Sequence, residues 1–110
     1  MFIALTVSLE VIKALKEVVE RLTTRDPALA DQVRRAASSA VLNLAEGSKR
    51  TGRDRSHHYR IAAGSSAEVR SALNVAAAWG ILDGIDLSPV ESLLDRQGAI
   101  LYRLAHPRAA

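Results

Sequence analysis

Apolar residues recur every three or four positions along most of the chain, the spacing that keeps one face of an α-helix apolar. The first stretch, predicted to be a helix over residues 2–23, carries its main apolar row at Leu5, Leu9, Ile12, Leu15, Val19 and Leu22. A second row widens the stripe at Ile3, Val7, Val11 and Val18. One neighbouring helix cannot cover so broad a stripe, so we expect the second row to pack against another copy of the chain.

Asp26 and Pro27 predict the start of a second helix, over residues 27–48. An aspartate accepts hydrogen bonds from the free N–H groups of a first turn, and proline has no N–H group to lose there. The apolar face that follows consists of Leu29, Val33, Ala36 or Ala37, Ala40 and Leu44. Gly47 returns to this face about five helical turns after Leu29. We therefore expect another helix to approach closely at Gly47.

A turn between Ser48 and Arg53, with Thr51 or Asp54 as the capping residue, precedes a third helix predicted over residues 54–79. Gly80 is the expected stop. The small-residue seam of this helix is predicted at His58, Ala62, Ser65, Val69, Ala72, Ala76 and Trp79. Gly64 lies beside this seam, where small residues favour close helix packing.

A fourth helix is predicted over residues 89–105, because Ser88 to Glu91 reads as a capping box with a proline inside it. Its apolar positions are Val90, Leu93, Leu94, Gln97, Leu101 and Leu104. Four helices joined by short connections predict an all-α, antiparallel up-down-up-down four-helix bundle that forms one domain over residues 1–110.

Composition narrows the class of protein. The chain has 110 residues, 48% hydrophobic and 25% charged, which are values of a globular domain and exclude disorder. It contains no cysteine, so disulfides, cysteine zinc sites and thiol catalysis are excluded. Aromatic residues make up only 4%, and so thin a core favours a homo-oligomer.

The apolar start of the chain, residues 1–9, is shorter than the roughly 20 residues that cross a bilayer. No basic residue precedes Lys13, as a signal peptide would require. We therefore expect a cytoplasmic protein without a membrane partner.

The net charge of +3 is unevenly placed. A basic cluster of Lys49, Arg50, Arg53, Arg55 and Arg60 is opposed only by Asp54 and interleaved with His57, His58 and Tyr59. Arginine forks beside a helix N-terminus suit phosphate groups, which indicates RNA or DNA as a partner. The alternative is that these arginines pair with acidic residues of a neighbouring helix or subunit.

Metal and catalytic interpretations are weaker. Asp54 and His57 have the spacing of a carboxylate–histidine metal pair, and Glu46 or Glu68 could complete a metal-dependent hydrolase or oxidase. A di-metal bundle needs two such motifs and the chain has one, so we expect no metal, no cofactor and no catalytic residue. Salt bridges to Arg50, Arg35 or Arg70 account for both glutamates.

Two separated motifs resemble the "four helix bundle protein" family, whose members include proteins encoded in intervening sequences of large-subunit ribosomal RNA genes. The first is Asn43-Leu44-Ala45-Glu46-Gly47, and the second is Tyr59-Arg60-Ile61-Ala62-Ala63-Gly64-Ser65 followed by Glu68. The matching motif positions are Asn43, Ala45, Glu46, Gly47, Gly64, Ser65 and Glu68.

The resemblance implies a four-helix protomer in a ring-like homopentamer with a central channel. The chain is also similar to the accessory variability determinant proteins of diversity-generating retroelements, pentamers that bind nucleic acid and a reverse transcriptase. The main hypothesis is a non-enzymatic homo-oligomeric scaffold that binds nucleic acid non-specifically through the basic cluster. The alternative is a structural protein–protein adaptor that binds no nucleic acid, and a metal-dependent enzyme ranks below both.

Overall fold

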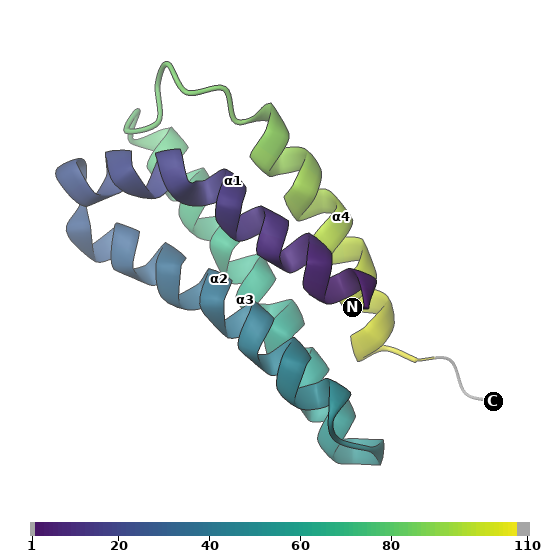
Figure 1. Ribbon diagram of the computed structural model, residues 1–110. Helices are drawn as coiled ribbons and strands as arrows, with labels where there is room; N and C mark the ends of the chain where they lie inside the picture. The colour runs from purple at the N-terminus through teal and green to yellow at the C-terminus, as the bar shows by residue number, and fades with distance from the viewer. Residues whose placement is uncertain (1, 108–110) are drawn as a thin grey trace.

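Four α-helices make up the computed structural model, which describes residues 2–107. The helices are α1 (Ile3–Arg25), α2 (Pro27–Ser48), α3 (Gly52–Ala78) and α4 (Ser88–Ala105). Each packs against two others, in the order α1, α2, α3, α4 and back to α1, and successive helices run in opposite directions (Figure 1). The predicted all-α class is confirmed. Every helix in this part of the chain is too short or too polar to cross a membrane.

Two of the predicted helix ends form for the expected reasons. The Leu29 N–H donates to the Asp26 carboxylate at 3.1 Å, with Pro27 in the first helical position. At the end of α3, Gly80 adopts φ +75°, a backbone conformation that favours glycine. The N–H of Ile81 then donates to the carbonyl of Ala76 at 3.0 Å, which closes the helix.

The predicted capping box of α4 is wrong. Ser88 lies inside the helix, and its N–H donates to the Asp86 carboxylate at 3.0 Å. This hydrogen bond lowers the pKa of Asp86. The third helix also differs, because α3 begins at Gly52, two residues before the predicted start, with no side-chain hydrogen bond from Thr51.

A buried polar layer divides the core into two apolar clusters. Ser66 Oγ donates to Gln97 Oε1 at 2.8 Å, and Gln97 Nε2 donates to Ser8 Oγ at 2.9 Å. All three side chains are buried, and they join α3, α4 and α1. The larger cluster lies on one side of this layer, and a smaller one on the other side contains Ala4, Leu44, Tyr59, Ala62 and Leu101.

The expectation for the apolar stripe of α1 is wrong. Val7, Val11 and Val18 are each 1% exposed inside the protomer, so they cannot form the surface that another copy covers. Of that row, only Ile3 is exposed, at 57%. The compact valines occupy the centre of the buried face. Four of the six residues of the predicted main row lie on its half-buried flank, at Leu5, Leu9, Ile12 and Val19.

The predicted seam of α3 is confirmed at Ala62, Val69, Ala72 and Ala76, which are buried, but differs at two other positions. Ser66 is buried where Ser65 was expected, and Trp79 is 77% exposed. Gly64 is exposed, and a Cβ atom added there would meet no atom within 4 Å. Close packing therefore does not involve Gly64.

Gly47 is the close-contact residue that the sequence predicts. A Cβ atom added at Gly47 would lie 2.7 Å from Cε1 of Tyr59 and 3.1 Å from Cβ of His58. The Tyr59 ring is part of the smaller core cluster, so it cannot move aside without disturbing that cluster. The C-terminal end of α2 therefore meets α3 at a distance that only glycine permits.

Replacing Gly47 by alanine is expected to destabilise the protein by about 1–2 kcal/mol in chemical denaturation. Overpacking a core costs roughly 1–3 kcal/mol, of which the better helix propensity of alanine recovers about 0.5–1 kcal/mol. Gly64→Ala is the matched control, because it gains the same propensity without a clash and should stabilise by about 0.5–1 kcal/mol. Equal effects of the two changes would contradict the close contact at Gly47.

Candidate nucleic-acid interface

The basic cluster lies at one end of the bundle. The last residues of α2, the turn and the start of α3 form a helical hairpin end that we call the tip, residues 46–60. Figure 1 shows it extending beyond the N-terminal end of α1 and the C-terminal end of α4. All five predicted phosphate-binding residues, Lys49, Arg50, Arg53, Arg55 and Arg60, lie on this projection.

The tip carries the whole net charge of the protein. It holds five of the 15 basic residues and two of the 12 acidic residues, so its net charge is +3, the same as that of the chain. The ten basic and ten acidic residues elsewhere cancel. A polyanion is therefore attracted to this end of the molecule.

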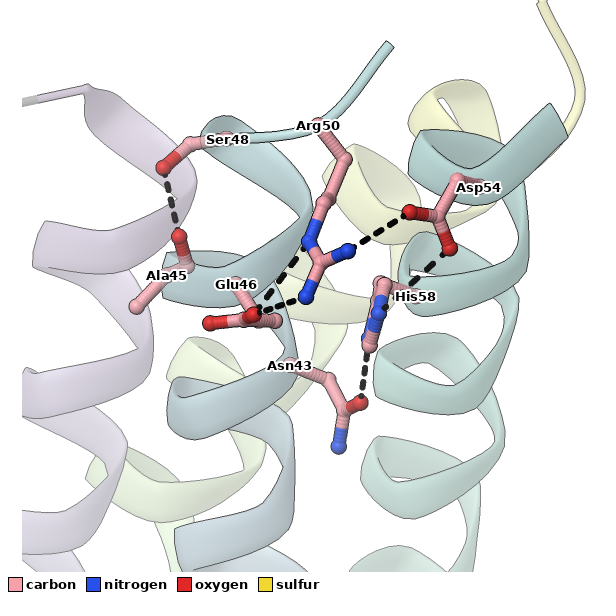
Figure 2. A network of polar contacts seen from close by, with 7 residues as sticks. All are labelled: Asn43, Ala45, Glu46, Ser48, Arg50, Asp54 and His58. Atoms are coloured by element: carbon pink, nitrogen blue, oxygen red, sulfur yellow. Dashed lines mark hydrogen bonds and ion pairs between the residues drawn. The ribbon is translucent and has the colours of Figure 1, made fainter. Parts of the chain in front are cut away.

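Arg50 bridges the two helices of the tip. Its guanidinium donates to Glu46 of α2, with Nη2 at 2.6 Å from Oε1, and to Asp54 of α3, with Nη1 at 3.0 Å from Oδ2 (Figure 2). The hydrogen bond from Arg50 lowers the pKa of Glu46. The carboxylates of Glu46 and Asp54 in turn raise the pKa of Arg50. Arg50 is thus held between two carboxylates and fixes the geometry of the turn.

A second set of contacts continues from the tip along the α2–α3 seam. Asn43 Nδ2 donates to the Ser39 carbonyl at 2.9 Å, so its Oδ1 accepts from Nδ1 of His58 at 3.0 Å. Nε2 of His58 lies 3.9 Å from Asp54 Oδ1 (Figure 2). Ser65 Oγ donates to Ser39 Oγ at 2.9 Å. These contacts hold α2 and α3 in register below the tip.

Arg55 closes the C-terminal end of α2. Its Nε donates to the carbonyl of Gly47 at 3.2 Å, and its Nη2 lies 3.5 Å from the carbonyl of Ser48. A cation is favourable there, because the free carbonyls of a helix C-terminus carry partial negative charge. Arg55 therefore serves the fold of the tip, as Arg50 does.

The other three cations of the tip point to solvent. Lys49, Arg53 and Arg60 are exposed, and none forms an ion pair with any residue between 2 and 107. His57 is also exposed, with its ring edge-on to His58. Tyr59 is buried under Gly47 and cannot stack on a base. The surface offered to a partner is thus three cations on a braced hairpin.

The remaining motif residues have mixed positions. Four of them take part in the contacts described above: Asn43, Glu46, Gly47 and Ser65. The carbonyl of Ala45 accepts a hydrogen bond from Ser48 Oγ at 2.7 Å. Gly64 and Glu68 are exposed on α3, outside this network.

Of the expected salt bridges, that of Glu46 with Arg50 is confirmed. Those of Glu68 are wrong, because Arg35 pairs with Asp31 and Arg70 with Asp95. Glu68 therefore lies outside the ion pairs of the described chain.

The structure does not bring the suggested metal ligands together. Asp54 contacts His58, one residue after the His57 of the sequence hypothesis, and both Asp54 and Glu46 are paired with Arg50. Between residues 2 and 107, no three His, Asp or Glu side chains are grouped so as to hold a metal ion. The contacts of Glu46, Asp54 and His58 stabilise the turn between α2 and α3.

Comparison with known proteins gives one family. The family model described as 23S rRNA-intervening sequence protein matches residues 3–103, which include the whole tip and nearly all of the four helices. No curated protein and no solved structure matches the chain.

Proposed function

Because the chain belongs to the family of 23S rRNA-intervening sequence proteins, we propose that it is a non-enzymatic, homo-oligomeric scaffold of the cytoplasm that binds nucleic acid through its tip. The observation that carries the proposal is that the cations of the tip have two different structural roles. Arg50 and Arg55 brace the hairpin, whereas Lys49, Arg53 and Arg60 are exposed without an ion pair in the described chain. Because the hairpin is rigid, the backbone that carries these cations loses little freedom when phosphates bind.

Contacts of this kind attach to the nucleic-acid backbone and do not read its sequence. The major groove of B-DNA, about 12 Å wide, admits one helix, whereas the tip presents two packed helices of roughly 10–12 Å each. The Tyr59 ring of the tip is buried in the core. We therefore assign phosphates as the ligand, and affinity should depend little on base sequence.

The proposal includes self-association, which a second feature of the structure supports. Exposed apolar side chains lie on the outer surface of α2 and α3, at Leu42, Ile61, Val75 and Trp79. An oligomer would cover part of this surface and present several tips to one polyanion, which raises the overall affinity through multivalency.

The same apolar residues favour a second candidate function, a protein–protein adaptor that binds no nucleic acid. The two candidates differ in one measurable property, the affinity of the purified protein for RNA and DNA. In an adaptor, the arginines of the tip would serve contacts between subunits.

Fluorescence anisotropy with labelled single-stranded RNA, duplex RNA and duplex DNA tests the proposal. We expect binding to each at low salt, about 50 mM, and affinities that differ little between unrelated sequences of the same length and strandedness. Absence of binding at this salt concentration would overturn the proposal in favour of the adaptor. A preference of 1,000-fold or more for one sequence would contradict phosphate binding as its basis.

A further inference from the structure

An apolar groove runs between α1 and α2 on the outside of the bundle. Its volume is about 350 Å³, near the lower end of the roughly 300–1,000 Å³ of clefts that hold small organic groups. Leu15, Val33 and Ala37 form its buried floor. Lys16 of α1 and Arg34 of α2 stand on its rim, opposed by Glu20. The groove therefore suits an apolar group with negative charge beside it.

The same chain carries a group of that description. Trp79, at the C-terminal end of α3, has the highest exposure of the large apolar side chains in the described part of the protein, 77%, and Val75 one turn earlier is 47% exposed. The connector that follows contains Asp83 and Asp86 and no basic residue. Trp79 thus combines a large apolar surface with adjacent negative charge.

We propose that Trp79 of one copy inserts into the α1–α2 groove of another copy, with the acidic connector against Lys16 and Arg34. This inference rests on the self-association proposed above and specifies its surface. Within one protomer Trp79 does not line the groove, so the contact joins two molecules. Because α3 runs antiparallel to α2, Trp79 and the groove both lie toward the end of the bundle opposite the tip.

Size and charge favour this occupant. A tryptophan buries roughly 150–250 Å², which is only part of the about 1,000 Å² that a specific interface requires. Val75 and the connector must therefore also lie against the neighbouring copy. The rim charges of Lys16 and Arg34 complement Asp83 and Asp86, whereas Arg21 is already committed to the carbonyls of Ile81 and Asp83.

In a ring or filament such a contact is heterologous, because each copy inserts its projection into one neighbour and receives the projection of the other neighbour in its groove. Each protomer then uses both surfaces, and repetition closes a ring or extends a filament. A copy that has lost only its projection keeps a working groove, and a copy with a blocked groove keeps its projection. A wild-type mass above that of a dimer separates this arrangement from a twofold dimer, in which two copies would exchange their projections.

The experiment measures mass by light scattering and native mass spectrometry for the wild type, Trp79→Ala and Ser38→Trp, which fills the groove from its rim. Each variant is expected to raise the concentration needed for assembly at least tenfold. Mixing the two should recover a one-to-one dimer, because each supplies the surface that the other lacks. Tyr102→Ala is the matched control, an exposed aromatic residue on α4 whose loss should leave the mass unchanged.

The outcomes separate this inference from the proposed function. A wild-type oligomer that neither variant affects would overturn the groove interface and leave self-association standing, with another occupant in the groove. Variants that dissociate but do not recover on mixing would overturn the heterologous contact. A wild type that is monomeric at about 100 µM would overturn both the inference and the proposed oligomer. Melting curves of each variant check that the protomer stays folded.

Discussion

Replacing Lys49, Arg53 and Arg60 together by alanine is expected to weaken nucleic-acid binding roughly 100-fold at about 0.1 M salt. Each cation that neutralises a phosphate releases about 0.7–0.9 counterions, and at this salt concentration each lost contact costs close to a factor of ten, less where contacts are incomplete. All three side chains are exposed, so the fold should be unaffected. Anisotropy titration of the wild type and the variant measures the difference.

The matched control removes the same charge elsewhere. Lys13, Arg25 and Arg96 are exposed, lie outside the tip and form no ion pair with residues 2–107. Their triple alanine variant has the same net charge as the tip variant and should lose only a few-fold in affinity. Equal losses in the two variants would show that overall charge, and not the tip, determines binding.

Replacing Gln97 by alanine is expected to destabilise the protein by about 2–4 kcal/mol. The change leaves a cavity between the two core clusters and removes the hydrogen-bond partner of both Ser8 and Ser66. Both the cavity and the buried hydroxyls that lose their partner cost free energy. Urea denaturation followed by circular dichroism measures the loss, which is large for a domain of this size.

A second variant distinguishes the polar layer from simple loss of volume. Combining Gln97→Leu with Ser8→Ala and Ser66→Ala removes all the polar groups at once, so no buried hydroxyl lacks a partner. We expect this triple variant to recover most of the stability that Gln97→Ala loses. If the triple variant is as unstable as Gln97→Ala, the loss of hydrogen-bond partners in the polar layer is not the cause of the destabilisation.

Much of the fold follows from the spacing of apolar residues, because a break in that spacing coincides with proline, glycine or a capping aspartate. As the sequence predicts, α2 begins at Pro27 and α3 ends before Gly80. The faces of α1 and α3 are less predictable. In α3, alanine occurs on every side, so Ala62 and Ala76 fit the predicted seam and the observed one equally, and the position of α4 decides that Ser66 is buried.

The candidate site divides in the same way. Local patterns identify the basic cluster and the pairing of Glu46 with Arg50, which lie four residues apart across the C-terminal end of α2. To predict contacts between helices, one must know the register of α2 against α3. The spacing of residues within one helix does not give that register. The hydrogen bond of Asn43 with His58 and the clasp of Arg55 on the end of α2 belong to this second kind.

The salt dependence of binding tests the central claim most directly, because counterion release counts phosphate contacts. The observed association constant of the wild type for a short duplex is measured between about 50 and 200 mM salt, beside the variant that lacks Lys49, Arg53 and Arg60. We predict a steep linear fall of log K with log salt for the wild type, and a slope shallower by about 2–3 for the variant, referred to one bound tip. A wild-type affinity independent of salt, or the same slope for both proteins, would contradict nucleic-acid binding by the tip.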